Sequence, residues 1–286
     1  MAANNLRVIY QNLADLSTTT ITATTTATSA VAGAISVDNL KKDAKSLIWR
    51  STSNDATLTV AFGSSKTLTG VILPFTNLSS GGLITVTCTG GSTATTGSIR
   101  ACPYAQTDSW DSSYLPTGAS SYGYGAGTYA RAWFSTPQTC TGLTIRFVDS
   151  TLTYIEASRL IIGNHWSPTY NTSFGLTSAT KSLSSNMRTE SGDLVTNRGI
   201  QYNSMSFDLS WLTPSDRAIF IKILKSNGIN KPLLISLFPN DAAAYDATID
   251  YDKEQTYQIY GKLSTLSDVT HPMFSMYSSK VEIEEI

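Results

Sequence analysis

Apolar residues in the first half of the chain recur in short runs, and Gly, Ser, Asn or Pro separates most of these runs. Many short strands at such spacing are typical of a β-sandwich or jelly roll. The first half is therefore predicted to be a jelly-roll β-sandwich. Its predicted strands are Asn5–Gln11, Leu47–Arg50, Ala56–Phe62, Thr69–Pro74, Leu83–Cys88, Gly97–Ala101, Ala130–Phe134, Thr141–Val148 and Tyr154–Ile162.

Two stretches interrupt this pattern. Ser17–Ser29 holds eight threonines in thirteen residues, which suits either a flexible linker or an exposed edge strand, because β-branched Thr favours extended backbone. Pro103–Tyr129 places aromatic residues among Gly, Ser and Asp without any periodicity. Loops longer than about fifteen residues are usually functional or disordered. We interpret this one as an ordered, aromatic-rich surface loop.

The character of the sequence changes near His165–Pro168, where a domain boundary is expected. Beyond it, Tyr202–Trp211 alternates between polar and mostly apolar residues, as a strand with one buried face does. Three more strands are predicted at Pro232–Phe238, Thr256–Leu263 and Phe274–Ile286. The buried face of the first strand is predicted to consist of Asn203, Met205, Phe207, Leu209 and Trp211.

One helix is predicted between these strands. Thr213 is its N-cap and Pro214 its first residue, and Asn227-Gly228 supplies a left-handed stop. The predicted fold is mainly β, with a jelly-roll domain over 1–164 and a β-sandwich domain over 165–286 that carries one helix at about 214–227. The apolar stripe of the helix is Ile219, Phe220, Ile223 and Leu224.

Charge is scarce in this chain. Charged residues make up 14% of it, against roughly a quarter in an average protein, and the formal net charge is -1. Copies of such a chain repel each other weakly, which favours assembly. The near-neutral balance argues against nucleic-acid binding, because phosphate contacts need a basic surface. No apolar run is long enough for a membrane span, and Met1–Tyr10 does not resemble a signal peptide, so synthesis and folding in a cytosol are expected.

Residues for catalysis or metal binding do not group in the sequence. The chain has only two histidines, His165 and His271, neither at metal-ligand spacing, and it has no Gly-x-Ser-x-Gly motif. We therefore predict a non-enzymatic protein without cofactor or metal. Two alternatives stay open. Asp108 and Asp111, which flank Trp110, could act as an acid–base pair on a sugar. Oxygen ligands for calcium could come from the closely spaced Asp246, Asp250, Asp252 and Glu254, although a solvated loop is the favoured interpretation.

The three cysteines, Cys88, Cys102 and Cys140, are odd in number and widely spaced. Buried free thiols are the favoured interpretation, and one disulfide stays open as the alternative.

Two groups of residues are candidates for binding. Tyr and Trp stack on sugars or pack at protein contacts, although Trp110 and Trp133 could equally plug the open end of the sandwich. The last residues alternate as a strand, which could lie at a sheet edge and pair with a neighbouring subunit, or lie inside its own sheet. The contact loop for glycan or protein is Trp110, Tyr114, Tyr122, Tyr124 and Tyr129, and the subunit-edge strand is Val281, Glu282, Ile283 and Glu284.

Short sequence segments in the two halves resemble two known families. The second half is similar to distal tail proteins at the tail tip of long-tailed (siphovirus-type) bacteriophages, and the first half to discoidin-type galactose-binding jelly rolls. The first resemblance rests on Ser167–Asn171, Arg188–Leu194, Ser206–Arg217, Asn227–Pro232, Ser236–Pro239 and Gln258–Leu263. The second rests on Trp49–Ser51, Gly70–Leu78 and Ser158–Gly163.

The resemblance implies a virion structural protein, made in the cytoplasm of the host bacterium and located at the phage tail tip. It implies a homo-oligomeric ring, a hexamer, that joins the tail tube protein to the tail hub proteins. In many distal tail proteins the decorating domain follows the ring domain, whereas here it precedes it. The alternative is a carbohydrate-binding adhesin module that recognises host-surface glycans.

Overall fold

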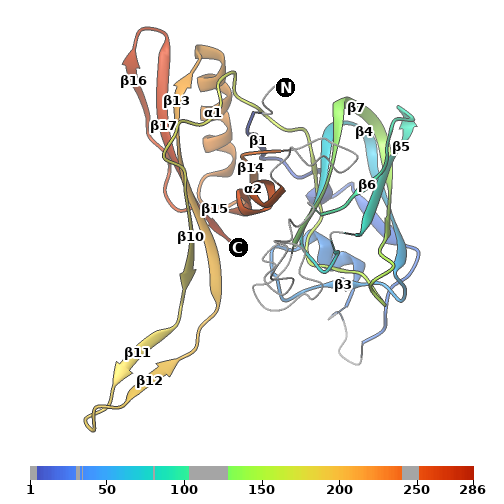
Figure 1. Ribbon diagram of the computed structural model, residues 1–286. Helices are drawn as coiled ribbons and strands as arrows, with labels where there is room; N and C mark the ends of the chain where they lie inside the picture. Colours follow the sequence, from blue (N-terminus) through green and yellow to red (C-terminus); the bar gives the residue numbers. More distant parts are fainter. Residues whose placement is uncertain (1–4, 30–32, 34, 80, 103–127, 240–250) are drawn as a thin grey trace. The chain divides into compact units, whose positions relative to one another are not determined.

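The computed structural model describes residues 5–29, 33, 35–79, 81–102, 128–239 and 251–286. The chain forms two compact units (Figure 1). Unit 1 consists of Met1–Ser167 with Leu233–Gln258, and unit 2 of Pro168–Pro232 with Ile259–Ile286. The first break lies close to the boundary predicted after residue 164. The segment Leu233–Gln258 differs from the sequence-based division, because its contacts place it with unit 1.

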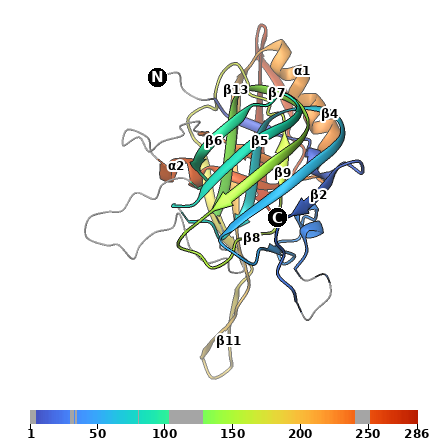
Figure 2. The same cartoon turned by 90° about the vertical axis from the view of Figure 1, so that its right-hand side faces the viewer.

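Unit 1 is built on an eight-stranded antiparallel sheet in the order β3-β8-β4-β7-β5-β6, with β2 and β9 also pairing with β4. Figure 2 shows β4, β5, β6 and β7 running side by side. The predicted mainly-β, jelly-roll-like sandwich is thereby confirmed. The strands are β2 (Thr20–Ala23), β3 (Trp49–Arg50), β4 (Asp55–Thr76), β5 (Leu83–Gly91), β6 (Thr95–Arg100), β7 (Thr128–Val148), β8 (Glu156–Ala157) and β9 (Ile161–Gly163).

Two long strands, β4 and β7, replace four predicted short ones. Each runs through a stretch that the sequence predicts to be a break between two strands. The register between β4 and β7 shifts at three places, and the first shift falls between Ala61 and Lys66. Gly63 lies in that first shift with φ +72°, a conformation that costs glycine little but other residues more. Register shifts of this kind bend a strand, so one long strand can follow a curved sheet.

The core of unit 1 follows from strand alternation. In β4 the side chains of Ala56, Leu58, Val60 and Phe62 are buried while the residues between them are more exposed. The Thr-rich stretch contributes β2, which pairs only with β4 among the described strands, so the edge-strand interpretation holds there. All three cysteines are buried free thiols, as expected.

Unit 1 also contains β1 (Arg7–Ile9), β14 (Leu233–Ser236), the helix α2 (Tyr251–Thr256) and two 3-10 helices at Leu13–Asp15 and Val37–Lys41. β1 and β14 pair in antiparallel fashion. Glu254 of α2 accepts two hydrogen bonds from Arg131 of β7, at 2.7 Å to Nε and 3.1 Å to Nη2. The two side chains are only 1% and 3% exposed. This buried ion pair holds the returning segment to the sandwich.

Unit 2 has an antiparallel sheet in the order β15-β17-β13-β10, with β16 also paired to β17. A separate two-stranded sheet is formed by β11 and β12. The strands are β10 (Thr177–Ser182), β11 (Ser185–Arg188), β12 (Leu194–Asn197), β13 (Gln201–Leu212), β15 (Gln258–Leu263), β16 (Val269–Met273) and β17 (Met276–Glu285).

The helix α1 of unit 2 spans Pro214–Asn227, the range that the sequence predicts. The Thr213 hydroxyl caps its start by accepting a hydrogen bond from the Asp216 amide at 3.2 Å. Gly228 ends it with φ +55°, and its amide donates to the Leu224 carbonyl at 2.8 Å. Phe220 and Ile223 are buried, whereas Ile219 of the predicted stripe is exposed.

The predicted buried face of β13 holds only in part. Met205, Phe207 and Leu209 are buried, but Trp211 is 47% exposed and Leu212 is 1% exposed. The pairing of β13 with β17 shifts between Leu209 and Leu212. This irregularity reverses the alternation, so that Leu212 takes the inward position.

Candidate functional sites

The aromatic loop predicted for contacts falls mostly outside the described residues. Trp110, Tyr114, Tyr122 and Tyr124 all lie there, together with the carboxylates at 108 and 111. Tyr129 is described and is 5% exposed, and its ring packs 5.6 Å from that of Phe75. Tyr129 is therefore a buried residue, and the prediction that it forms a surface contact is wrong.

A different tyrosine is exposed in unit 1. Tyr154 is 37% exposed, and the Arg50 guanidinium lies over its ring, with Cζ 4.4 Å from the ring centroid. The Tyr154 carbonyl accepts a hydrogen bond from the Asn77 side chain at 3.0 Å, which fixes the loop before β8. The sequence pattern gives no signal for Tyr154, because it stands at the start of a predicted strand and not in an aromatic cluster.

Arg50 connects this tyrosine to a carboxylate. It faces Glu156 across the β3–β8 pair, and its Nε and Nη2 atoms contact the Glu156 carboxylate. The Glu156 amide donates to the Asn77 side chain at 2.7 Å, and its carbonyl accepts from the Thr76 hydroxyl at 2.7 Å. In the described chain Arg50 Nη1 has no hydrogen-bond partner. We call Arg50, Tyr154 and Glu156 the corner site.

Backbone strain lies beside the corner site. Phe75 has φ +58°, which is rare for a bulky residue and is often found at functional sites. The Lys45 ammonium lies 4.2 Å from the centroid of its ring. Thr76, the next residue, pairs with Ala157 of β8, the strand that carries Glu156. This part of unit 1 therefore combines aromatic rings with cationic donors.

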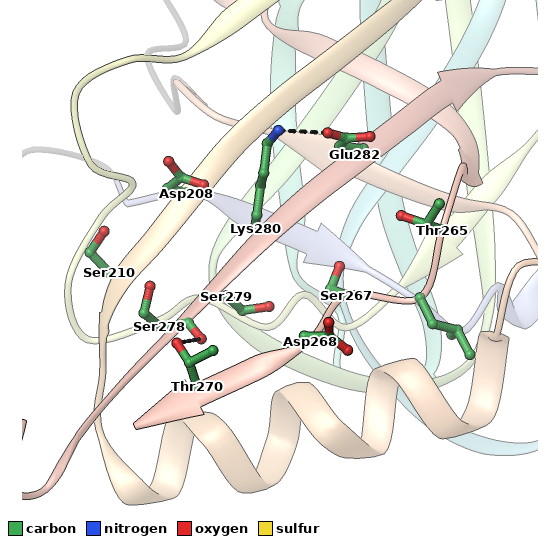
Figure 3. A pocket seen from close by; sticks show the side chains of 11 residues that line it. Asp208, Ser210, Thr265, Ser267, Asp268, Thr270, Ser278, Ser279, Lys280 and Glu282 are labelled. Carbon is green, nitrogen blue, oxygen red and sulfur yellow. Dashed lines mark hydrogen bonds and ion pairs between the residues drawn. The ribbon is translucent and has the colours of Figure 1, made fainter. Parts of the chain in front are cut away.

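Unit 2 holds a polar pocket of about 420 Å³ (Figure 3). Lys280 of β17 pairs across the sheet with Asp208 of β13, and its ammonium lies 2.7 Å from a Glu282 carboxylate oxygen. Nearly all of its side chains carry hydroxyl or charged groups. The lining consists of Asp208, Ser210, Thr265, Leu266, Ser267, Asp268, Thr270, Ser278, Ser279, Lys280 and Glu282.

The ion pair in this pocket is not arranged for acid–base catalysis. The hydrogen bond from Lys280 lowers the pKa of Glu282, and the same bond raises the pKa of Lys280. Both shifts favour the charged forms at neutral pH. A general acid or base works best with a pKa near the working pH, and these shifts move both groups away from it.

Other chemistry is equally sparse in the described residues. They contain no group of three or more His, Cys, Asp or Glu side chains that could hold a metal ion. His165 Nδ1 lies 2.7 Å from the Thr69 hydroxyl, and the His271 ring stacks on Tyr277 with centroids 4.6 Å apart. Both histidines therefore have local partners. No described helix combines the length and apolar character that a bilayer span needs.

A two-stranded ribbon extends from unit 2, and we call Leu183–Ile200 the arm. Figure 1 shows its strands β11 and β12 continuing beyond β10 and β13. Every residue of the arm is exposed. Met187 and Val195 face each other across it, 69% and 48% exposed, and the Leu183 amide donates to the Ile200 carbonyl at 3.0 Å. Such apolar cross-strand pairs normally face a second layer.

The predicted subunit-edge strand lies inside its sheet. Ile283 of β17 pairs with Met205 of β13 on one side and with Leu263 of β15 on the other. The Glu282 carbonyl accepts a hydrogen bond from the Ser264 amide at 3.0 Å. Val281 and Ile283 are buried, and Glu282 and Glu284 face the other way, as the alternation predicts. Because β17 has pairing partners on both sides, it is an internal strand of its own sheet, which is the second of the two alternatives that the sequence leaves open.

Comparison with known proteins gives likeness to solved structures only. No protein-family model matches the sequence, and no curated protein matches it either. A Clostridium perfringens module, CpGH89CBM32-5, in complex with GalNAc-β-1,3-galactose, is 12% identical, with 54% of this chain and 99% of that chain covered and a TM-score of 0.36.

Two further solved structures have similar values. A family 32 carbohydrate-binding module of Clostridium perfringens NanJ, in complex with galactose, is 9% identical, with coverage of 55% and 98% and a TM-score of 0.34. A chitosan-binding module from a Paenibacillus sp. IK-5 chitosanase/glucanase is 18% identical, with coverage of 53% and 98% and a TM-score of 0.34. Tail proteins are not among these named structures. At such values the likeness carries no argument about function.

Proposed function

We propose that unit 1 is a carbohydrate-binding module and that the corner site contacts the sugar. The exposed Tyr154 ring beside Arg50 carries this proposal. The apolar face of a sugar ring packs on an aromatic ring, while its hydroxyls accept hydrogen bonds from donors such as Arg50 Nη1. The contacts of Glu156 with Thr76 and Asn77 hold the arginine in place, so little order has to be gained on binding. No catalytic step is part of this function.

Titration calorimetry with galactose and GalNAc-β-1,3-galactose, the sugars bound by the named modules, tests the proposal. Tyr154→Ala is expected to weaken binding roughly ten-fold, because it removes the stacking surface. Tyr170→Ala is the matched control, since Tyr170 is an exposed tyrosine of unit 2. A second variant, with Trp110, Tyr122 and Tyr124 changed to Ala, probes the loop predicted from the sequence.

Three results separate the alternatives. Loss in Tyr154→Ala alone supports the corner site. Loss only in the variant of Trp110, Tyr122 and Tyr124 would keep the glycan function and move it to that loop. No saturable binding of any sugar by the unchanged protein at millimolar concentration would contradict the function itself.

We propose as a second function that unit 2 assembles with copies of itself through the arm. The observation that favours it is the group of exposed apolar side chains on the arm, which no other described residue buries. An isolated two-stranded ribbon is marginally stable in water, and contiguous exposed apolar surface marks interaction sites. The low charge of the chain reduces the repulsion between copies.

The finer form of this second function is a ring at the tip of a bacteriophage tail, between the tail tube and the hub proteins, with unit 1 turned to host glycans. It is supported by the sequence phrases that resemble distal tail proteins. Light scattering on the purified protein and mass spectrometry of phage particles test it. A protein that is strictly monomeric and missing from particles would contradict it.

The double variant Met187→Thr and Val195→Thr tests the role of the arm in assembly. Threonine favours extended backbone, so the strands are kept while apolar surface is removed. The variant is expected to lower the mass of the assembly. Met273→Thr, which changes an exposed methionine of β16, is the control. Equal masses for the arm variant and the unchanged protein would place the contact elsewhere.

A further inference from the structure

We propose that the free edge of β10 pairs with β10 of a second copy of this chain, in antiparallel fashion about a two-fold axis. β10 lies at the end of the sheet of unit 2 and pairs on one side with β13 (Figure 1). None of the described strands pairs with its other side. Pairing along this edge uses backbone groups and not the apolar side chains of the arm, so it is a second and separate contact surface.

The backbone of β10 directs every second residue away from β13. The Leu183 amide donates to the Ile200 carbonyl at 3.0 Å, and the same register continues without a shift into β10. Hydrogen-bonded and non-hydrogen-bonded pairs alternate in an antiparallel ladder, so the odd-numbered residues of β10 bond to β13. The N–H and C=O groups that point to the free edge therefore belong to Ser178, Thr180 and Ser182.

β10 lacks the features that usually keep an edge strand from pairing, which are proline, bulges and guarding charges. β16 carries Pro272, and its register with β17 shifts between Thr270 and Met273. β6 pairs with β5 in a broken register, and Gly97 in it has φ +68°. β10, by contrast, has neither proline nor glycine, is exposed along all six residues and pairs with β13 in unbroken register.

The charge on β10 is held over the sheet. Lys181 is the one charged residue of this strand, and edge lysines commonly prevent strands from pairing. Its ammonium contacts the carboxylate of Glu284 in β17, which lies on the far side of β13. This ion pair compensates the lysine charge within its own sheet, so the charge does not guard the edge.

The edge is complementary to itself. An antiparallel pair centred on Thr180 places Ser178 of one copy opposite Ser182 of the other, and each facing pair of this kind exchanges two hydrogen bonds. Between these pairs Lys181 faces Ala179 of the other copy and not a second lysine. No like charges are directly opposed, and the net charge of -1 adds little repulsion between copies. A second copy therefore matches this edge in backbone and in charge.

The same register brings the arm of the second copy to the segment before β10. Leu183 of the second copy then lies beside Thr177, and Phe174, three residues before Thr177, has a fully exposed side chain. The exposed Met187 of the arm would gain an apolar neighbour there. This side-chain contact rests on the proposed assembly through the arm, whereas the pairing of β10 does not.

Hydrogen exchange on the unchanged, isotope-labelled full chain tests the pairing. Amide exchange is followed by NMR at increasing protein concentration, and light scattering gives the mass. The amides of Ser178, Thr180 and Ser182 are expected to exchange fast in the dilute monomer and to become protected as the mass doubles. The odd-numbered amides of β10 bond to β13 in both states and are the internal control. A protein that stays monomeric at millimolar concentration, or a dimer in which the three amides still exchange fast, would overturn the proposal.

Thr180→Pro tests the edge by substitution. The Thr180 amide points to the free edge, so proline removes a donor there and leaves the ladder with β13 in place. Thr180→Val is the matched control, because it keeps the amide and the β-branched shape while both variants lose the hydroxyl bond to Asn203 at 3.1 Å. The dissociation constant of the dimer should rise at least roughly a hundred-fold with proline and change little with valine. Equal constants for the two variants would contradict the pairing.

Light scattering on Thr180→Pro and on the double variant of Met187 and Val195 separates the edge from the arm. A loss of mass with proline alone supports the edge and ends assembly through the arm. A loss in the arm variant alone ends the edge proposal and leaves the arm, and a loss in both supports both contacts. Exchange protection of β13 amides shows whether the proline variant is folded. If it is not, the exchange experiment on the unchanged protein decides.

Discussion

The β5–β6 hairpin of unit 1 and the arm of unit 2 are built from similar residues but differ in what lies behind them. In β5 the side chains of Ile84, Val86 and Cys88 are buried. In the arm Met187 and Val195 face each other across the two strands and stay exposed. Polar–apolar alternation therefore defines a face, while a second layer decides whether this face becomes a core.

The difference is also one of energy. Burying one aliphatic side chain contributes about 1.5–3 kcal/mol, so the hairpin is stabilised by its own unit. The arm gains much less of this from its own chain, because its apolar side chains are 48–69% exposed. We propose that a contact with a second copy buries it. Substitutions in the buried parts of the molecule and in the arm should therefore have different effects.

The largest effect is expected at the buried ion pair of unit 1. Glu254→Ala leaves Arg131, which is 3% exposed, without its carboxylate, and should lower the free energy of unfolding by about 3–5 kcal/mol. Urea denaturation measures this. Asp55→Ala breaks the exposed pair with Arg146 and should change stability little. Similar losses in both variants would show that burial does not set the strength of these pairs.

Two leucines give the most direct comparison. Leu58 is fully buried in β4, and Leu58→Ala should cost about 2–5 kcal/mol through lost contacts and a cavity. Leu194 in the arm is 57% exposed, so Leu194→Ala should leave unfolding nearly unchanged while lowering the assembly mass. Thermal unfolding and light scattering on both variants check this. An unfolding cost in Leu194→Ala close to that of Leu58→Ala would mean that the arm is packed within its own chain.

A smaller effect is expected at the helix of unit 2. Thr213→Ala removes the hydroxyl that accepts from the Asp216 amide and should cost about 1 kcal/mol. Thr213→Ser keeps the hydroxyl and should retain most of the stability. Circular dichroism during urea unfolding measures both variants. No difference between Ala and Ser would indicate that the cap contributes nothing.

The last prediction concerns acid stability. Burial by itself would raise the pKa of Asp149, but hydrogen bonds from Thr151 and Ser79 outweigh it, and the pKa is lowered. The stability from this group is therefore present above the unfolded pKa of about 3.9 and is lost as the pH falls through the lower folded value. Asp149→Asn should weaken the protein at neutral pH and flatten its loss of stability in acid.

Asp193→Asn in the arm serves as the control for that experiment and should leave the loss of stability in acid unchanged. Unfolding is followed by urea titration at several pH values between neutral and strongly acidic. If the free energy of unfolding of Asp149→Asn fell as steeply in acid as that of the unchanged protein, the role of this carboxylate would be contradicted.

Local signals in the sequence predicted the elements that depend on them. The helix Pro214–Asn227 follows from its cap and its glycine stop, and the strand pattern gives the mainly-β fold. The strands of the arm were missed, because its short runs, with Thr189–Asp193 between them, bury no face that alternation could reveal. The inner position of β17 depends on pairing with strands that are distant in sequence. The periodicity of a segment does not reveal which strands pair with it.

The candidate sites were harder to predict for the same reason. Tyr154 and Arg50 come together only through the β3–β8 pairing, about a hundred residues apart in the chain. Likewise, the carboxylates of the pocket meet because β13 pairs with β17 and β16 pairs with β17. Composition gave the weak charge that favours assembly, but not where the contacting surfaces lie.

The central claim, that this chain acts through binding surfaces in which Tyr154 contacts a sugar, is tested most directly by NMR on the labelled full chain during titration with GalNAc-β-1,3-galactose. Saturable shifts at Arg50, Tyr154 and Glu156, and none in the arm, are expected. Shifts confined to unit 2, or no shifts at millimolar sugar, would contradict the claim.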